Sequence, residues 1–154
     1  MTKRCNILSL LFLVVCYQGN VHADSSVDGK APVPVIIKQA LDIYKGDGAE
    51  KFLLALSKGS PIDGDRSVIA QIDGVEKIEN KYGRYLGYDI VQVHDISKRS
   101  RLTYYVMNYE KGPLFAKATS YKTENKGEVL ASFYFHTSEE KIFPESLLVH
   151  NVEK

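Results

Sequence analysis

The chain has 154 residues with 20 basic and 19 acidic side chains, and 44% of its residues are hydrophobic. This length and apolar content are typical of one globular domain with its own core. The net charge of +1 provides no field that would draw the protein to nucleic acid or to an anionic membrane, so we expect neither as a partner.

The first 23 residues have the pattern of a secretory signal peptide. Lys3 and Arg4 form a positive n-region, Ile7–Val15 an apolar h-region, and Val21–Ala23 a small-residue cleavage site. The apolar run is shorter than the about 20 residues that a membrane-spanning helix needs. We therefore predict a signal peptide over residues 1–23 that is cleaved after Ala23, export to the periplasm or the extracellular space, and no membrane span.

Both cysteines, Cys5 and Cys16, lie within this segment, so the mature chain contains none. Small exported eukaryotic domains usually rely on disulfides, and their absence favours a bacterial envelope protein. The run before Cys16 resembles a bacterial lipobox, but Val15 is bulky where a small residue belongs. A lipoprotein anchored at Cys16 is therefore the alternative to a freely exported chain.

Three helices are predicted after a flexible leader over residues 24–34. Apolar residues recur at helical spacing over Val35–Tyr44 and Ala49–Leu56, and glycines or prolines follow each stretch. A third helix is predicted from the N-cap Asp65 to Tyr82. Its apolar face consists of Val68, Ile69, Ile72, Val75 and Ile78.

Four antiparallel strands are predicted over Leu86–His136, because β-branched and aromatic runs alternate with three turn sequences. The turns are Ser97–Ser100, Glu110–Pro113 and Glu124–Gly127. We read the basic run at the first turn, Lys98–Arg101, as solvated charge at a hairpin tip. The predicted fold is α+β, with N-terminal helices packed on a curved four-stranded meander. It forms a single domain over residues 35–143 and ends in a loose tail over 144–154.

Alternation along the strands predicts which residues share a face. If every turn is a symmetric four-residue connection, one face carries Tyr88, Ile90, Gln92, His94, Thr103, Tyr105, Met107, Tyr109, Ala116, Ala118, Ser120, Val129, Ala131, Phe133 and Phe135. The alternative is a bulge at the Gly127 hairpin, which would slip the last strand by one residue and swap its faces. We expect Phe133 to be a core residue between sheet and helix. The opposite face is apolar at Val91, Val93, Leu102 and Val106, which favours a homodimer through that face.

Four short motifs rich in tyrosine, glycine and phenylalanine occur from the end of the third predicted helix onward. They are, in order, Tyr82–Tyr85, Gly87–Tyr88, Tyr109–Phe115 and Ser132–Phe135. In this combination the chain resembles the nuclear-transport-factor-2-like superfamily, which includes ketosteroid isomerase and belongs to the cystatin-like folds, and in particular its uncharacterised exported bacterial members. The resemblance implies a cone-shaped fold. It does not select an activity, because isomerases, dehydratases, transport factors and binding modules all share that fold.

No catalytic or metal-binding residue is predicted. The mature chain has three histidines, His94, His136 and His150, and no pair has metal-ligand spacing. We therefore expect no metal and no cofactor. His94 is followed by Asp95, but adjacent strand residues point to opposite faces, so this carboxylate cannot orient the imidazole. Motifs for serine or cysteine nucleophiles and phosphate-binding glycine loops are absent.

Large aromatic side chains opposite small ones predict a cavity within the cone. The expected ligand-binding residues are Tyr88, Gln92, His94, Thr103, Tyr105, Met107 and Tyr109. The sequence thus favours an exported, non-catalytic domain that binds a small apolar or amphipathic molecule. One alternative is an isomerase- or lyase-type enzyme that uses His94 with Tyr105. The other is an envelope protein-interaction module that acts through its open sheet face.

Overall fold

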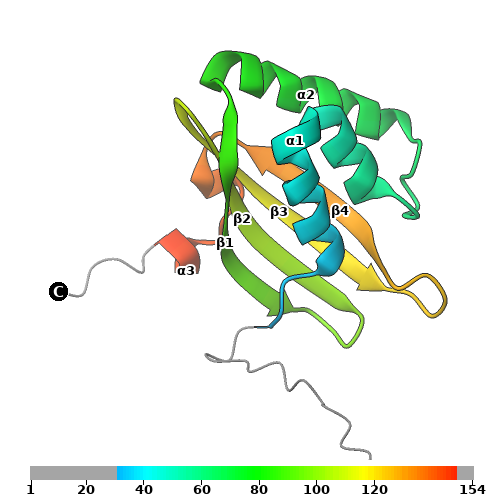
Figure 1. The fold of residues 1–154 in the computed structure, drawn as a ribbon. Coiled ribbons are helices and arrows are strands. Elements are labelled where there is room, and N and C mark those ends of the chain that lie inside the picture. The colour runs from blue at the N-terminus through cyan, green and yellow to red at the C-terminus, as the bar shows by residue number, and fades with distance from the viewer. Residues whose placement is uncertain (1–30, 149–154) are drawn as a thin grey trace, which may run out of the picture.

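The computed structural model describes residues 31–148, in which two helices lie on one face of a four-stranded antiparallel sheet (Figure 1). The elements are α1 (Val35–Ser57), α2 (Arg66–Tyr82), β1 (Tyr85–Asp95), β2 (Ser100–Tyr109), β3 (Gly112–Lys122), β4 (Glu128–His136), a 3-10 turn η1 (Glu139–Lys141) and α3 (Glu145–Leu148). The sheet order is β1-β2-β3-β4, so the predicted α+β class and meander are confirmed. The predicted signal peptide, both cysteines, most of the leader and His150 lie outside the described residues.

Helix α1 joins the first two predicted helices into one bent element. The break is at Gly48, whose φ of 82° and ψ of −176° are non-helical. This left-handed φ is open to glycine because glycine has no Cβ. The two halves therefore run in different directions and both bury apolar residues (Figure 1). The buried set includes Ile37, Leu41 and Tyr44 before the bend and Phe52, Leu53 and Leu56 after it.

Helix α2 begins as predicted at Asp65, whose Oδ1 accepts a hydrogen bond of 2.7 Å from the Ser67 amide. Hydrogen bonds to Ser67 hold the pKa of this exposed carboxyl below its ordinary value. At the other end, the Gly83 amide donates to the Glu79 carbonyl (2.8 Å). The Lys111 amide donates to the Tyr82 carbonyl (2.8 Å), which ties the β2–β3 turn to the end of α2.

Two irregularities in the strand pairing change the predicted faces. Strands β2 and β3 pair without a shift, and Tyr105 lies opposite Ala116. In β1 the register shifts between Ile90 and Gln92, so Val93 pairs with Thr103 while His94 pairs with Leu102. One extra residue reverses the alternation beyond it. The prediction that Gln92 and His94 share a face with Thr103 is therefore wrong.

The second irregularity lies in β4, opposite Thr119 and Ser120. Leu130 pairs with Ser120 and is buried, whereas Ala131 falls in the bulge and is exposed. The predicted inward facing of Ala131 is wrong for this reason, whereas Val129 is buried beside Gly59. Beyond the bulge the prediction holds, since Phe133 pairs with Ala118, is 5% exposed, and lies edge-on to Phe52 at 5.9 Å between ring centroids.

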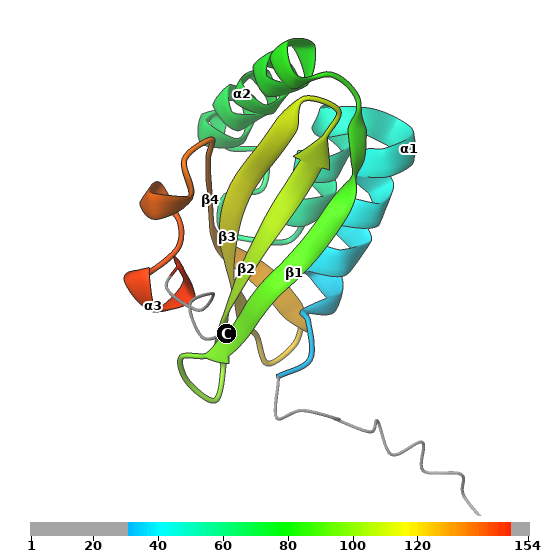
Figure 2. The same ribbon diagram turned by 90° about the vertical axis from the view of Figure 1, so that its left-hand side faces the viewer.

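The C-terminal segment covers part of the sheet face that points away from the helices (Figure 2). Ile142 and Phe143 are buried there, and the Phe143 ring meets Tyr104 and Phe115 edge-on, with centroids 5.8 and 5.4 Å apart. The chain continues into α3 in a region predicted to be loose. A sheet-face homodimer remains a prediction, but this face already has an intramolecular cover.

Candidate binding site

The seven residues predicted to line a cavity do not come together at one site. Thr103, Tyr105 and Met107 have no exposed surface and Tyr109 is 4% exposed, so all four are packed in the core. A side chain that no water molecule can touch does not line an open cavity. Tyr88 lies at the margin, where its hydroxyl donates to Asp42 Oδ1 (3.2 Å). Gln92 and His94 lie on the other face of the sheet.

His94 and Tyr105 cannot form one catalytic site in this arrangement. His94 is exposed on the outer face, whereas Tyr105 is fully buried under the helices. Burial raises the pKa of the Tyr105 phenol well above its ordinary value of 10.0, which weakens it as a proton donor near neutral pH. The geometry does not favour the isomerase or lyase alternative.

Tyrosine hydroxyls cluster in the core beside α2. Tyr44 stacks on Tyr85 at 4.2 Å between centroids, and the Tyr44 and Tyr109 hydroxyls hydrogen-bond at 2.9 Å. The Tyr44 hydroxyl also donates to Glu79 Oε2 (3.2 Å). Burial, above all, raises the pKa of Tyr109 to about 12 and that of Tyr44 further, so these phenols are neutral. They fill the core and hydrogen-bond within it.

Two hollows lie at the opposite end of the sheet, which we call the hairpin end because the β1–β2 and β3–β4 hairpins meet there. The polar pocket has a volume of about 290 Å³ and is lined by Asp95, Ser97, Lys98, Arg99, Ser100, Arg101, Lys122, Gly127 and Glu128. The apolar groove has a volume of about 600 Å³ and is lined by Gly59, Ser60, Pro61, Arg99, Tyr121, Thr123, Glu124, Asn125, Lys126, Val129, Leu130 and Ala131. Arg99 lines both, and the groove has the size of a small-molecule site.

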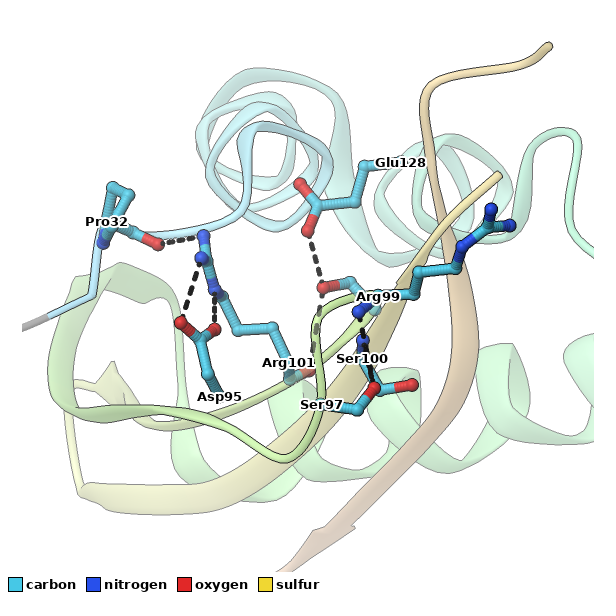
Figure 3. A network of polar contacts seen from close by, with 8 residues as sticks. Pro32, Asp95, Ser97, Arg99, Ser100, Arg101 and Glu128 are labelled. Atoms are coloured by element: carbon cyan, nitrogen blue, oxygen red, sulfur yellow. Dashed lines mark hydrogen bonds and ion pairs between the residues drawn. The ribbon is translucent and has the colours of Figure 1, made fainter. Parts of the chain in front are cut away.

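The β1–β2 loop is held in shape by Ser97 (Figure 3). Its Oγ accepts hydrogen bonds from the amides of Arg99 (3.2 Å) and Ser100 (3.0 Å). The Lys122 amide donates to the Arg99 carbonyl (2.7 Å), which joins the loop to the end of β3. A serine side chain that binds nearby amides in this way is a common turn-forming device, and it fixes the backbone that presents Arg99.

Arg101 anchors the chain that precedes α1 to the hairpin end (Figure 3). Its guanidinium donates to both carboxylate oxygens of Asp95 (2.6 and 3.4 Å) and to the Pro32 carbonyl (2.9 Å). The hydrogen bond from Arg101 holds the pKa of the exposed Asp95 carboxyl below its ordinary value. Across the pocket, the Ser120 hydroxyl donates to Glu128 Oε1 (2.7 Å). Asp95, Arg101 and Glu128 are thus engaged in structural contacts.

Arg99 is held more loosely than Arg101. Its Nη2 lies 3.0 Å from Glu124 Oε1, and the two side chains are 49% and 73% exposed. This hydrogen bond raises the pKa of the Arg99 guanidinium. Exposed ion pairs contribute about 0–1 kcal/mol, so the pair can open at little cost. Arg99 is therefore a cation available at the junction of the polar pocket and the apolar groove.

The sequence contained a signal for this site that our predictions did not use. In a meander the first and third turns lie at the same end of the sheet, which brings Ser97–Ser100 close to Glu124–Gly127. The basic run at the first turn is indeed exposed, but it also borders a hollow. What the pattern could not indicate is that the loop at Gly59–Pro61 forms the other wall of the groove.

Within residues 31–148, no three His, Cys, Asp or Glu side chains are grouped closely enough to hold a metal ion. Across the same residues no helix is both long and apolar enough to cross a membrane. Comparison of the chain with protein-family models, curated proteins and solved structures gives no match. The function therefore has to be argued from the residues of the site.

Proposed function

We propose that this protein is an exported, non-catalytic binding domain that holds a small amphipathic molecule in the apolar groove at the hairpin end. The observation that carries the proposal is a groove of about 600 Å³ with an apolar floor and, at its rim, a cation that is held by an exposed ion pair. The class of ligand is the one expected from the sequence. The proposed binding site, however, is at the hairpin end of the sheet and not in the interior, which is packed.

The walls of the groove explain why an apolar group would bind there. Val129 and Leu130 are buried and form its floor, and Ala131 in the β4 bulge leaves room above them. Tyr121 is 38% exposed on one side, and Pro61 lies in the facing loop. A ligand in the groove covers mainly the exposed surface of Ala131, Tyr121 and Pro61, and each Å² of apolar surface removed from water contributes about 25 cal/mol.

The residues around both hollows support binding rather than catalysis. Their linings include serine hydroxyls but no histidine or cysteine, and the carboxylates Asp95 and Glu128 are already hydrogen-bonded. General acid–base catalysis requires a titratable group near neutral pH within reach of the substrate. Neither hollow offers such a pair.

Export and family membership belong to the same proposal. The three regions of a signal peptide within residues 1–23 support export to a bacterial envelope or beyond. The order of helices followed by a four-stranded meander, together with the tyrosine and glycine motifs, supports a cone-like fold of the nuclear-transport-factor-2-like superfamily. We propose both on this basis.

A binding experiment with the mature protein tests the proposed function. Calorimetric titration with decanoate, below its critical micelle concentration, should show binding to the wild type. Ala131→Trp fills the groove and should weaken that binding by at least about tenfold, a loss of 1.4 kcal/mol. Leu86→Trp is the matched control, since Leu86 is an exposed strand residue outside the groove. Equal affinity of the two variants, or no binding to the wild type, would reject the proposal.

A further inference from the structure

We infer that the ligand of the apolar groove carries an anionic head group, and that Arg99 binds this group by releasing Glu124. The inference rests on the proposed function and adds the charge of the ligand and the residue that recognises it. It is argued from the position of Arg99, from the charges around it, and from the weakness of its present ion pair.

The position of Arg99 makes it the link between an apolar and a polar environment. It is the residue that lines both the polar pocket and the apolar groove, and the Ser97 turn fixes its backbone. An amphipathic molecule whose chain lies in the groove against Ala131 and Tyr121 would place its head group at this junction. The head group would therefore meet a guanidinium first.

The surrounding charges favour an anion over a cation. The polar pocket is lined by four basic residues, Lys98, Arg99, Arg101 and Lys122, and by two acidic ones, Asp95 and Glu128. Both acids have partners, because Asp95 accepts from Arg101 and Glu128 accepts from Ser120. The lining thus carries two more basic than acidic residues, and this positive charge attracts an incoming anion.

Glu124 occupies the place that the ligand's anion would take. It lines the apolar groove and holds Arg99 through one hydrogen bond of 3.0 Å, with both side chains largely in water. A guanidinium can bind a carboxylate or phosphate through two parallel hydrogen bonds, which are stronger than a single contact. A ligand that also buries its chain can therefore displace Glu124, and Glu124 acts as an internal competitor.

The test compares head groups on one chain length. Decanoate, decyl phosphate, decyl glucoside and decyltrimethylammonium are titrated below their critical micelle concentrations. The wild type should bind the two anions at least about tenfold more tightly than the glucoside and the cation. The anion that binds more tightly identifies the head group as carboxylate or phosphate. Similar affinities for all four head groups would overturn the inference while leaving the proposed groove intact.

Three variants assign the effect to Arg99. Arg99→Gln should remove the preference for the anions over the glucoside, so that the anions lose at least about tenfold in affinity relative to the glucoside measured on the same variant. Glu124→Gln should tighten anion binding by about threefold, because the competitor is lost. Arg84→Gln is the control, since Arg84 forms a comparable exposed ion pair with Glu110 (3.4 Å) at the other end of the sheet. Retention of the anion preference in Arg99→Gln would overturn the inference, whereas failure of every amphiphile to bind the wild type would reject the proposed function itself.

Discussion

The two ends of the sheet differ in how they are closed. At the end formed by the β2–β3 turn, the Lys111 amide binds the Tyr82 carbonyl and the rings of Tyr44, Tyr85 and Tyr109 pack together under the helices. At the hairpin end, charged side chains surround two hollows. The first end, which we call the closed end, has its tyrosine rings packed under the helices and one hollow of about 360 Å³ at its margin beside Tyr85 and Tyr88, whereas the hairpin end has both of its loops bordering hollows.

Residue size and loop position account for this difference. At the closed end, Gly112 lets the β2–β3 turn approach Tyr82 so closely that an added Cβ would lie 2.8 Å from the ring. At the hairpin end, the small Ala131 faces the loop at Gly59–Pro61 across the groove. Substitutions at the closed end should therefore change stability without affecting binding, and substitutions in the apolar groove should change binding at a smaller cost in stability.

The largest expected effect on stability comes from Phe52→Ala. Phe52 has no exposed surface and its ring contacts Tyr44 and Phe133, with centroids 5.2 and 5.9 Å apart. Truncation of such a buried ring costs about 3–5 kcal/mol. Chemical denaturation measures the loss. The control is Leu54→Ala on the same helix, which is 43% exposed and should cost less than about 1 kcal/mol. Equal losses of unfolding free energy in the two variants would contradict the burial of Phe52 between Tyr44 and Phe133.

A smaller loss is expected from Phe143→Ser on the outer face of the closed end. The substitution removes the ring that covers Tyr104 and Phe115 and should cost about 1–3 kcal/mol. It should also cause self-association at micromolar concentration, because apolar sheet surface becomes exposed. Light scattering after size-exclusion chromatography measures the molecular mass of the wild type and of the variant. A wild type that is already dimeric, and that Val106→Asp makes monomeric, would instead support the homodimer predicted from the sequence.

Gly112→Ala tests the close approach at the closed end directly. The new methyl group would meet the Tyr82 ring, so we expect a loss of about 1–3 kcal/mol from the displacement of packed atoms. Gly46→Ala is the matched control, since a Cβ there meets nothing within 4 Å and the residue lies within α1. It should stabilise the protein by about 0.5–1 kcal/mol. A Gly112 variant as stable as the wild type would argue against the closed packing.

The smallest effect is expected at the hairpin end, from Asp95→Asn. Because Arg101 lowers the pKa of Asp95, this carboxylate stabilises the folded state above its ordinary pKa of 3.8, and the contribution is lost as the pH falls through the lower value. The wild type should therefore be more stable than the variant at neutral pH, and the difference should shrink in acid. Asp73→Asn, at an exposed position of α2, is the control. A difference that does not depend on pH would contradict the role of the ion pair.

Local patterns were sufficient to predict most of the fold. The Asp65 cap, the three turns and the helical spacing of Val68, Ile72, Val75 and Ile78 are properties of short segments, and the structure confirms them. The prediction that Ile69 shares the packed face of α2 is wrong, because this side chain is 57% exposed. A bulge in the last strand is an alternative that the sequence leaves open at the Gly127 hairpin, but the alternation does not indicate its position at Ala131 or the second bulge at Val91. This is why Gln92 and His94 were placed on the inner face.

The candidate site was harder to predict because it depends on segments that are distant in the chain. The apolar groove needs Gly59–Pro61 beside the β3–β4 hairpin, and the cover of the outer face needs Phe143 on Phe115. Large aromatic residues opposite alanines suggested an empty interior, yet the bend at Gly48 lets both halves of α1 fill it. Side-chain volumes on the sheet alone could not reveal what the helices contribute.

Chemical-shift mapping tests the location of binding most directly. In a titration of the 15N-labelled mature protein with decanoate, the largest amide shifts should occur at Ser97–Ser100, at Tyr121–Ala131 and at Gly59 and Ser60, the residues around the two hollows. The closed end, including Tyr85 and Tyr109, should remain unchanged. Shifts concentrated instead at Tyr88 and Thr103–Tyr109 would place the ligand between the sheet and the helices and contradict a binding site at the hairpin end.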